Sequence, residues 1–507
     1  LQYIPQKGEI VYLRENDNLS TGGIAIDVTD EVHTANANIA VMAAKIIGLD
    51  IAGVDITVSD ISIPLDVANG AVIEINAAPG IRMHHFPSQG KGRNVAGEII
   101  KLLYPEEKEV TIPIISVTGT NGKTTTVRMI DHILRAMGYN VGMTNTDGVF
   151  FNGECMKKGD NTGPMSARAV LMDNRVEYAV LETARGGIVN KGLGYDLADV
   201  GLITNIQEDH LGIDGIETME DLAFVKALVI EAVKEDGYAV LNADDEYCMK
   251  IKDRAKSKLI LFSTNPNNEF LVSHIEKGGI GFYVDEGTMY LCKGNETTKI
   301  MDVDQIPATM GGILRHNIYN ALAATAGAYG LGIGIEDIVK GLSTFDCNEK
   351  QNKGRFNQFD VNGVKVIIDY AHNIDGYKNI ISSLKAIKKK RLIGVIGVPG
   401  DRTDSSTITI GELCGNCFDR IYIKEDKDKR NRKPGEVAEL LKKGCQLGTI
   451  PESEIFIELS EPKAFEMAIA NAEPDDIVIV FYEEYEPLVQ VVEKMKASYK
   501  KAGLIIA

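Results

Sequence analysis

The sequence predicts an α/β fold with two successive units, one built on a parallel sheet and one Rossmann-like, preceded by part of an α+β domain. Two observations carry this prediction. From about residue 110 onward, apolar segments typical of buried strands alternate with amphipathic helical patterns, which is the order of a parallel sheet flanked by helices. After the first of these segments, a glycine-rich loop opens a helical pattern.

Length and composition limit the class of protein. The 507 residues are too many for one ordinary core, and 44% apolar with 25% charged residues is typical of a globular protein. Because 72 Asp and Glu outnumber 54 Lys and Arg, the net charge of −18 argues against nonspecific binding to nucleic acid or to an anionic membrane. No apolar run is long enough to span a bilayer, so we expect a cytoplasmic protein without a membrane partner.

Composition shifts divide the chain into three predicted domains, residues 1–108, 109–344 and 345–507. The middle domain alternates the strand segments 178–181, 200–204 and 238–241 with helical patterns at 217–233 and 316–329. Short alternating runs between residues 270 and 300 predict a local antiparallel insertion. The last domain repeats strand–helix pairs, which predicts a small doubly wound sheet with strands at 364–369, 392–397, 420–424, 455–458 and 477–481.

The glycine-rich loop lies in the run S-V-T-G-T-N-G-K-T-T-T at residues 116–126. An apolar strand precedes it and a helix follows, which is the context that a phosphate-binding loop requires. Backbone N–H groups and the helix N-terminus would bind phosphate oxygens, Lys123 would reach the outer phosphates, and Thr124 would complete a Mg²⁺ shell. The general pattern has glycine where this chain has Val117, which leaves the shorter form T-G-T-N-G-K-T-T. The loop predicts ATP binding.

Two further residues extend this candidate site. Glu182 ends an apolar strand and His210 follows another, so both would lie at the carboxyl edge of a parallel sheet, where α/β folds bind ligands. Together they could hold a divalent cation beside the one at Thr124. Taken singly, Glu182 could instead be a helix N-cap and His210 a hydrogen-bonded loop histidine.

The combination of motifs resembles the Mur ligase superfamily. After the loop come L-E-T-A-R-G-G at 181–187, T-N-I-Q-E-D-H-L-G at 204–212 and H-N-I-Y-N-A-L-A-A at 316–324. Within that superfamily, T-G-P-M-S-A at 162–167 and E-T-A-R-G-G-I at 182–188 are similar to the cyanophycin synthetase family. The resemblance spans residues 110 to 507. It implies a Mur ligase-like P-loop ATPase domain followed by a Rossmann-like C-terminal domain.

This resemblance implies roles for individual residues. The catalytic residues would be Lys123, Lys226, His210 and Arg355, and Lys226 resembles a lysine that is carbamylated and helps to position a second Mg²⁺. On pattern alone, Lys226 would be a solvated helix lysine. Thr124, Glu182 and His210 would be metal ligands. The nucleotide would contact Gly119, Thr120, Asn121, Gly122, Lys123, Thr124, Thr125, Asn317, Arg355, Asp369 and His372.

A second constellation lies in residues 1–108. Glu74 and Asn76 alternate on one strand and so point to the same side, and with Asp55 on a neighbouring strand they form a plausible Mg²⁺ site. These residues resemble the metal-binding end of ATP-grasp ligases. An ATP-grasp fold also needs a preceding subdomain that supplies nucleotide lysines and a lid. We therefore expect that residues 1–108 do not complete an ATP-grasp reaction by themselves.

The resemblance implies an ATP-dependent amide ligase with ATP and Mg²⁺ as cofactors. Its substrates would be arginine, aspartate and the polymer primer, with arginine joined to the β-carboxylate of aspartate on a poly-aspartate backbone through an acyl phosphate. We also expect a homo-oligomer that binds no nucleic acid. Two alternatives stay open: another Mur-type ligase, which makes a peptidoglycan precursor or a polyglutamyl folate, and a non-catalytic nucleotide-binding paralogue. The sequence does not decide between arginine and lysine.

Overall fold

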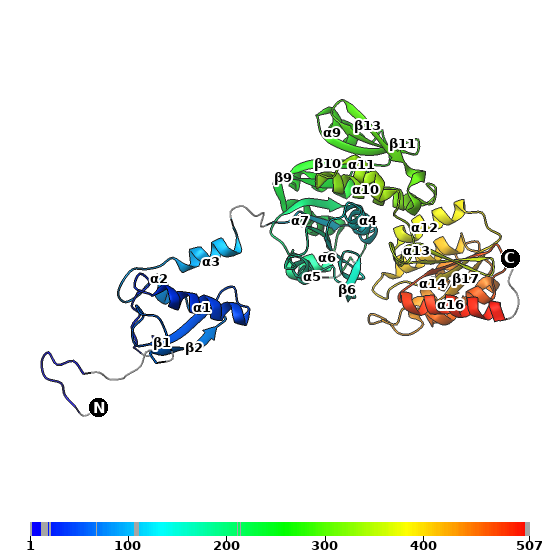
Figure 1. The fold of residues 1–507 in the computed structure, drawn as a ribbon. Helices are drawn as coiled ribbons and strands as arrows, with labels where there is room; N and C mark the ends of the chain where they lie inside the picture. The colour runs from blue at the N-terminus through cyan, green and yellow to red at the C-terminus, as the bar shows by residue number, and fades with distance from the viewer. Residues whose placement is uncertain are drawn as a thin grey trace. The chain divides into compact units, whose positions relative to one another are not determined.

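The computed structural model describes residues 3–11, 19, 22–66, 68–105, 111–209, 211–212 and 214–501 (Figure 1). Residue contacts divide the chain into two compact units, residues 1–111 and 112–507. Each unit is described by itself below. No helix among the described residues is both long and apolar enough to cross a membrane.

The first unit is a small α+β arrangement. Its elements are α1 (Thr34–Ile47), β1 (Gly53–Val58), β2 (Gly70–Asn76), α2 (Arg82–His85) and α3 (Val95–Leu103). The two strands pair antiparallel, and α1 contacts both of them. Among the described residues of this unit only Asn36 is fully buried, and its amide bonds the backbone of the 61–65 segment. Asn36 therefore joins α1 to the 61–65 segment, and no described apolar side chain in this unit is fully buried.

An eleven-stranded sheet organises the first part of the second unit. Its strand order is β13-β12-β11-β10-β9-β8-β3-β7-β4-β5-β6, and the run from β11 to β4 is parallel while both edges are antiparallel. The strands are β3 (Ile114–Thr118), β4 (Val141–Asn145), β5 (Gly148–Phe151), β6 (Glu154–Lys158), β7 (Tyr178–Glu182), β8 (Ala198–Ile203), β9 (Val233–Asn242), β10 (Lys258–Ser263), β11 (Ile280–Asp285), β12 (Thr288–Lys293) and β13 (Glu296–Asp302).

Helices cover both faces of this sheet because successive strand residues point to opposite sides. In β8, Val200 and Leu202 join one apolar cluster while Ile203 joins another, and β9 and β10 alternate in the same way. The first face carries α4 (Lys123–Ala136), α10 (Arg315–Gly330) and α11 (Ile335–Leu342). The second face carries α5 (Pro164–Leu171), α6 (Arg185–Lys191), α7 (Met219–Glu231), α8 (Glu246–Ile251) and α9 (Glu269–Glu276).

A six-stranded sheet organises the rest of the unit, in the order β14-β15-β19-β16-β17-β18, with only β14 antiparallel. Its strands are β14 (Asn357–Val361), β15 (Val364–Asp369), β16 (Leu392–Ile396), β17 (Arg420–Ile423), β18 (Ile455–Ile457) and β19 (Ile477–Phe481). One face packs against α15 (Glu461–Ala470) and α16 (Tyr485–Lys501). The other packs against α12 (Ile374–Ala386), α13 (Asp404–Gly415) and α14 (Glu436–Cys445).

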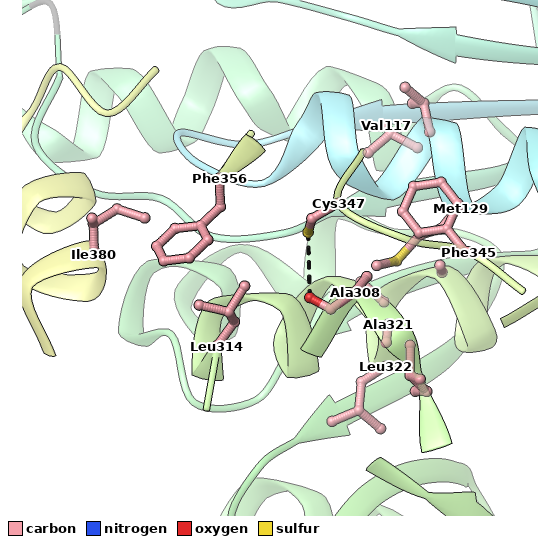
Figure 2. Close-up of a cluster of buried hydrophobic side chains, with 14 of the residues drawn as sticks. Val117, Met129, Ala308, Leu314, Ala321, Leu322, Phe345, Cys347, Phe356 and Ile380 are labelled. Atoms are coloured by element: carbon pink, nitrogen blue, oxygen red, sulfur yellow. Dashed lines mark hydrogen bonds between the residues drawn. The ribbon is translucent and has the colours of Figure 1, made fainter. Parts of the chain in front are cut away.

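The two sheets of the second unit share one apolar core. Buried residues of α4 and α10 belong to the same cluster as buried residues of β15, β16 and β19. Figure 2 shows part of this cluster, in which Phe356 and Ile380 lie on the side of Leu314, and the Cys347 thiol donates to the Ala308 carbonyl at 3.4 Å. This continuity holds the segment that follows Phe345 against the first sheet.

The structure corrects one prediction and adds elements that the sequence did not indicate. Residues 269–276 form α9, and the antiparallel strands begin only at Ile280. From Ile280 the predicted antiparallel pairing is present, between β11 and β12 and between β12 and β13. These strands extend the main sheet, because β11 pairs parallel with β10. The hairpin β5–β6 and the edge strand β14 were not predicted. Cys414 is buried in the apolar cluster, and burial raises the pKa of its thiol well above the usual range.

Candidate functional site

The glycine loop runs from the end of β3 into the start of α4, as predicted. Gly122 is the helix N-cap and has φ +86°, and a Cβ there would lie 2.2 Å from Asn320 Oδ1. Gly119 has φ +148°, and its Cβ would lie 2.0 Å from Thr204 Oγ1. Both positions therefore require glycine. Val117 is buried inside β3, paired with Glu182 and Leu202, so the position without glycine belongs to the strand and not to the loop.

Lys123 lies over this loop. Its Nζ donates hydrogen bonds to the carbonyl oxygens of Gly119 and Thr120, both at 3.0 Å. Asn121 N donates to Asn205 Oδ1 at 2.9 Å, which ties the loop to the end of β8. The ammonium group is thus held where N–H groups at the start of a helix favour an anion.

An oxygen cluster forms beside Lys123. Glu182, at the carboxyl end of β7, is 2% exposed and accepts from Thr124 Oγ1 at 2.9 Å and from Thr146 Oγ1 at 3.0 Å. The N-cap of the following helix is Ala184, so the N-cap alternative for Glu182 is wrong. A carboxylate with two hydroxyl oxygens is a donor set that fits Mg²⁺. Among the described residues no group of three or more His, Cys, Asp or Glu side chains is arranged for a metal. His210, predicted as a further ligand, lies outside the described residues.

Lys226 approaches the same loop from α7. Its side chain is 3% exposed and its Nζ donates to the Gly119 carbonyl at 2.8 Å. Burial, reinforced by the positive charge of Lys123, lowers the pKa of Lys226 to about 7. The alternative of a solvated helix lysine is therefore wrong, and much of this amine is neutral near neutral pH.

The segment that leads into the second sheet contributes Arg355. Its Nη2 donates to Thr124 Oγ1 at 3.3 Å, and its guanidinium lies 4.4 Å from the ring centroid of Tyr370. The flanking backbone has positive φ at Gly354 and Phe356, and Phe356 N donates to Asp369 Oδ2 at 2.8 Å. Residues 354–370 thus bring a cation from the second sheet to the end of the glycine loop.

A buried arginine on α4 holds the segment that carries Arg355. Arg128 Nη1 donates to Asn352 Oδ1 at 3.2 Å and to the Lys353 carbonyl at 2.9 Å, and Nη2 pairs with Asp147. One side chain with three acceptors therefore fixes the segment against the helix that begins in the glycine loop. A role for Arg128 was not predicted, because an arginine within an amphipathic helix is typical of an exposed face.

The loop residues 120–125, Glu182 and Arg355 line one cavity of about 370 Å³. Three residues predicted to contact the nucleotide, Asp369, His372 and Asn317, lie on its wall, and Asn317 Nδ2 donates to the Ala308 carbonyl at 2.7 Å. The cavity also contains residues that were not singled out, all from loops or helix ends around the sheet edges: Thr146, Asn205, Gln207, Asp245, His316, Tyr319, Asn320 and Tyr370. The first four, from Thr146 to Asp245, each follow a parallel strand, and that position in the sequence could have identified them as candidate site residues.

The predicted metal residues of the first unit lie together on its hairpin. Asp55 pairs directly with Glu74 in the strand register, and Asn76 Nδ2 donates to Asp55 Oδ2 at 3.4 Å. A carboxylate pair with one amide oxygen is compatible with a hard cation.

Family models match three stretches of the chain. The Mur ligase middle domain matches residues 117–328, the Mur ligase glutamate ligase domain matches 354–481, and a RimK-like ATP-grasp domain matches 11–103. The two Mur ligase matches together take up most of the second unit. The ATP-grasp match lies in the first unit.

Comparison with curated proteins gives relatives of two kinds. The cyanophycin synthetase of Synechocystis sp. is 45% identical over 98% of this chain and 57% of the relative, and that of Trichormus variabilis is 44% identical over 97% and 55%. The chain thus spans somewhat more than half the length of these relatives. A UDP-N-acetylmuramoyl-L-alanyl-D-glutamate–2,6-diaminopimelate ligase of Fusobacterium nucleatum is 29% identical over 74% of this chain and 73% of the relative.

Solved structures agree on the fold. MurF from Acinetobacter baumannii matches with a TM-score of 0.55 at 19% identity, over 81% of this chain and 82% of that chain. E. coli FolC in complex with DHPP and ADP matches with a TM-score of 0.54 at 18% identity, over 80% and 98%. The chain thus carries the Mur ligase middle domain at residues 117–328 and the Mur ligase glutamate ligase domain at 354–481, and over nearly its whole length it is similar to the cyanophycin synthetases.

Proposed function

We propose that this chain is an ATP-dependent amide ligase that joins the α-amine of arginine to the β-carboxylate of an aspartate on a poly-aspartate backbone. The reaction runs through an acyl phosphate. The carboxylate oxygen takes the γ-phosphoryl group of ATP, and the bond to the β-phosphate breaks to release ADP. The amine then attacks the acyl carbon, loses a proton and displaces phosphate.

One observation supports this chemistry: the parts of the fold built on the two sheets place groups that suit ATP phosphates around one cavity. The glycine loop and Lys123 come from the first sheet, and Arg355 comes from the segment that leads into the second. Both cations would neutralise charge on the transferring phosphoryl group, and Lys123 would do so at the start of α4. Asn317, Asp369 and His372 would bind the rest of the nucleotide, and the loop N–H groups would bind its phosphates.

Thr124 and Glu182 would hold Mg²⁺, with His210 as a further ligand and Thr146 as a nearby oxygen donor. When bound, the cation would neutralise phosphate charge and orient the γ-phosphoryl group. The neutral amine of Lys226 is suited to carbamylation, because CO₂ reacts with an unprotonated amine. The resulting anion would lie next to the glycine loop, where positive groups gather.

The names of the relatives support the choice of substrates. The 45% identity extends over nearly all of this chain, whereas the diaminopimelate ligase matches at 29% over a shorter stretch. The match to an ATP-grasp domain in the first unit adds a feature that fits the cyanophycin synthetases. We propose that this unit contributes to aspartate addition through Asp55, Glu74 and Asn76. The domain limits 1–108, 109–344 and 345–507, a cytoplasmic location and a homo-oligomeric state stay predictions.

ADP release by the 507-residue chain should require both arginine and a β-aspartyl peptide. The assay compares that pair with lysine plus the same peptide, with a UDP-muramyl peptide plus diaminopimelate, and with a folate plus glutamate. Turnover with either of the last two pairs would contradict the proposal and favour another Mur-type ligase. ATP binding without arginine-dependent ADP release would instead favour a nucleotide-binding protein without this activity.

A conservative change at Arg128 should separate positioning of Arg355 from nucleotide binding. Lysine keeps the charge but bonds fewer of the three acceptors at once, so Arg355 should lose its fixed position. We expect kcat to fall about 10- to 100-fold in Arg128→Lys with a small change in KM for ATP. Arg135→Lys, on the same helix but partly exposed and bonded to Asp131, is the matched control. An unchanged kcat in Arg128→Lys would refute the positioning role.

A further inference from the structure

Asp245 is a buried carboxylate in the wall of the cavity beside the glycine loop, and it accepts more hydrogen bonds than a helix cap requires. It is 3% exposed and is the N-cap of α8, where its Oδ1 accepts from Cys248 N at 2.9 Å. An N-cap needs one side-chain oxygen, which asparagine would supply as well. The second oxygen, Oδ2, accepts from Ile206 N and from Gln207 Nε2, both at 2.9 Å. These two bonds join the end of β9, which Asp245 follows, to the segment 204–207 after β8.

The bond to Asp245 fixes the side chain of Gln207 in one orientation. A carboxylate only accepts hydrogen bonds, so the amide must present its Nε2 to Asp245. The backbone of Gln207 is held as well, because its N–H donates to the Thr120 hydroxyl and its carbonyl accepts from the same hydroxyl, at 3.0 Å each. Asp245 therefore reaches Thr120 of the glycine loop through one intervening residue.

Further bonds of the segment 204–207 reach the same part of the glycine loop. The carbonyl of Asn205 accepts from Thr120 N and its side chain accepts from Asn121 N, both at 2.9 Å. The Asn205 Nδ2 and the Thr204 hydroxyl donate to the Asn121 carbonyl at 3.0 Å and 2.7 Å. The segment 204–207 thus fixes the first half of the loop.

The glycine loop needs such restraints because two of its residues are glycines with positive φ. Gly119 and Gly122 have φ of +148° and +86°, and glycine reaches other conformations at little cost. A loop with this freedom loses conformational entropy when it binds a ligand, and bonds that already hold the binding conformation reduce that loss. Bonds from outside the loop therefore favour phosphate binding at the start of α4.

We propose that Asp245 is a positioning residue that holds the glycine loop in its phosphate-binding conformation through Gln207. The inference rests on the proposed function for the identity of the ligand, which is ATP. Asp245 sets the position of Gln207, and Gln207 sets the position of Thr120, so the carboxylate acts without touching the phosphates. Its effect is expected in the affinity for ATP.

The test uses two single variants of the 507-residue chain and their combination. In Asp245→Asn the amide oxygen keeps the cap at Cys248 N, and the amide nitrogen then faces the N–H donors of Ile206 and Gln207. In Gln207→Glu the cap is untouched, and two carboxylates face each other. Each variant loses a buried hydrogen bond, so we expect the dissociation constant for a non-hydrolysable ATP analogue to rise roughly 10- to 100-fold.

The double variant restores the pair in reverse. The new amide nitrogen at position 245 donates to the new carboxylate at position 207, and the dissociation constant should return to within about 5-fold of the parent value. Asp199→Asn is the matched control, because it makes the same change near the start of β8, where Asp199 accepts from Ile114 N at 2.8 Å and pairs with Lys234. It should bind the analogue as the parent chain does.

The outcomes separate a positioning role from loss of folding and from failure of the proposed function. Calorimetry gives the affinity separately from the number of sites, so partial unfolding alone lowers the number of sites and leaves the dissociation constant unchanged. If affinity falls in both single variants and returns in the double variant, but arginine is not consumed, the positioning role holds and the proposed reaction fails. If either single variant binds the analogue as tightly as the parent chain, or if the double variant stays as weak as the single ones, the positioning role is overturned whatever the turnover.

Discussion

Replacing Lys123 with alanine is expected to abolish arginine incorporation. The change removes the ammonium group that lies over the glycine loop and would neutralise the transferring phosphoryl group. Loss of one such charge at a phosphoryl-transfer site lowers kcat by roughly 10²- to 10³-fold or more. ADP release with arginine and a β-aspartyl peptide gives the rate, and incorporation of labelled arginine gives the product.

A matched control separates this effect from a general loss of lysine charge. Lys340 lies on α11, is exposed and pairs with Asp337, so Lys340→Ala should keep the parent rate. Lys123 is on the surface of a cavity and supports no core packing, so the thermal midpoint of Lys123→Ala should stay close to that of the parent chain. Unchanged arginine incorporation in a folded Lys123→Ala protein would refute the assignment of this loop to catalysis.

Replacing Lys226 with methionine is expected to remove activity while the protein stays folded. Methionine preserves the buried aliphatic chain of this residue, which is 3% exposed, and removes the amine that would carry the carbamate. Activity of the parent chain should fall in buffer depleted of CO₂ and return when bicarbonate is added. Carbon-13 NMR after loading with labelled bicarbonate should detect a carbamate in the parent chain and in Lys340→Met, and none in Lys226→Met.

The pH dependence of stability tests independently whether the amine of Lys226 is buried. The pKa of Lys226 is lowered from 10.5 to about 7 in the folded chain. Between these values the unfolded chain carries a proton that the folded chain lacks, so the free energy of unfolding rises with pH by up to about 1.4 kcal/mol per pH unit. Below pH 7 both states are protonated and the contribution is at its lowest, constant value.

Lys226→Met should lose this component of the pH dependence, measured by denaturant unfolding in CO₂-depleted buffer between pH 6 and 10. Identical pH profiles for the variant and the parent chain would mean that the amine is not buried as described. Full activity of Lys226→Met would mean that no carbamate at this position is needed.

Much of the fold could be predicted because strands that are buried on both faces occur in the sequence as short continuous apolar runs. All eight strands predicted outside the 270–300 region are present within one or two residues of their predicted bounds, apart from the longer β9. The prediction failed at residues 269–276 and at β14, where short amphipathic or polar runs are compatible with more than one local structure. At these residues the choice between helix and strand depends on the segment that they pair with or pack against. That segment cannot be identified from the neighbouring sequence.

The sequence by itself determined the glycine loop, the strand that ends in Glu182 and the family resemblance, because each rests on residues that are close together in the chain. Only the tertiary structure placed Arg355 against Thr124, which is 231 positions away, and Lys226 against Gly119, which is 107 positions away. It alone assembled the nucleotide cavity, which Lys123 and Glu182 line from the side of the first sheet and Asp369 from the second. Parallel strands gather their carboxyl ends at one edge whatever their separation in sequence, so residues that share no local pattern become one site.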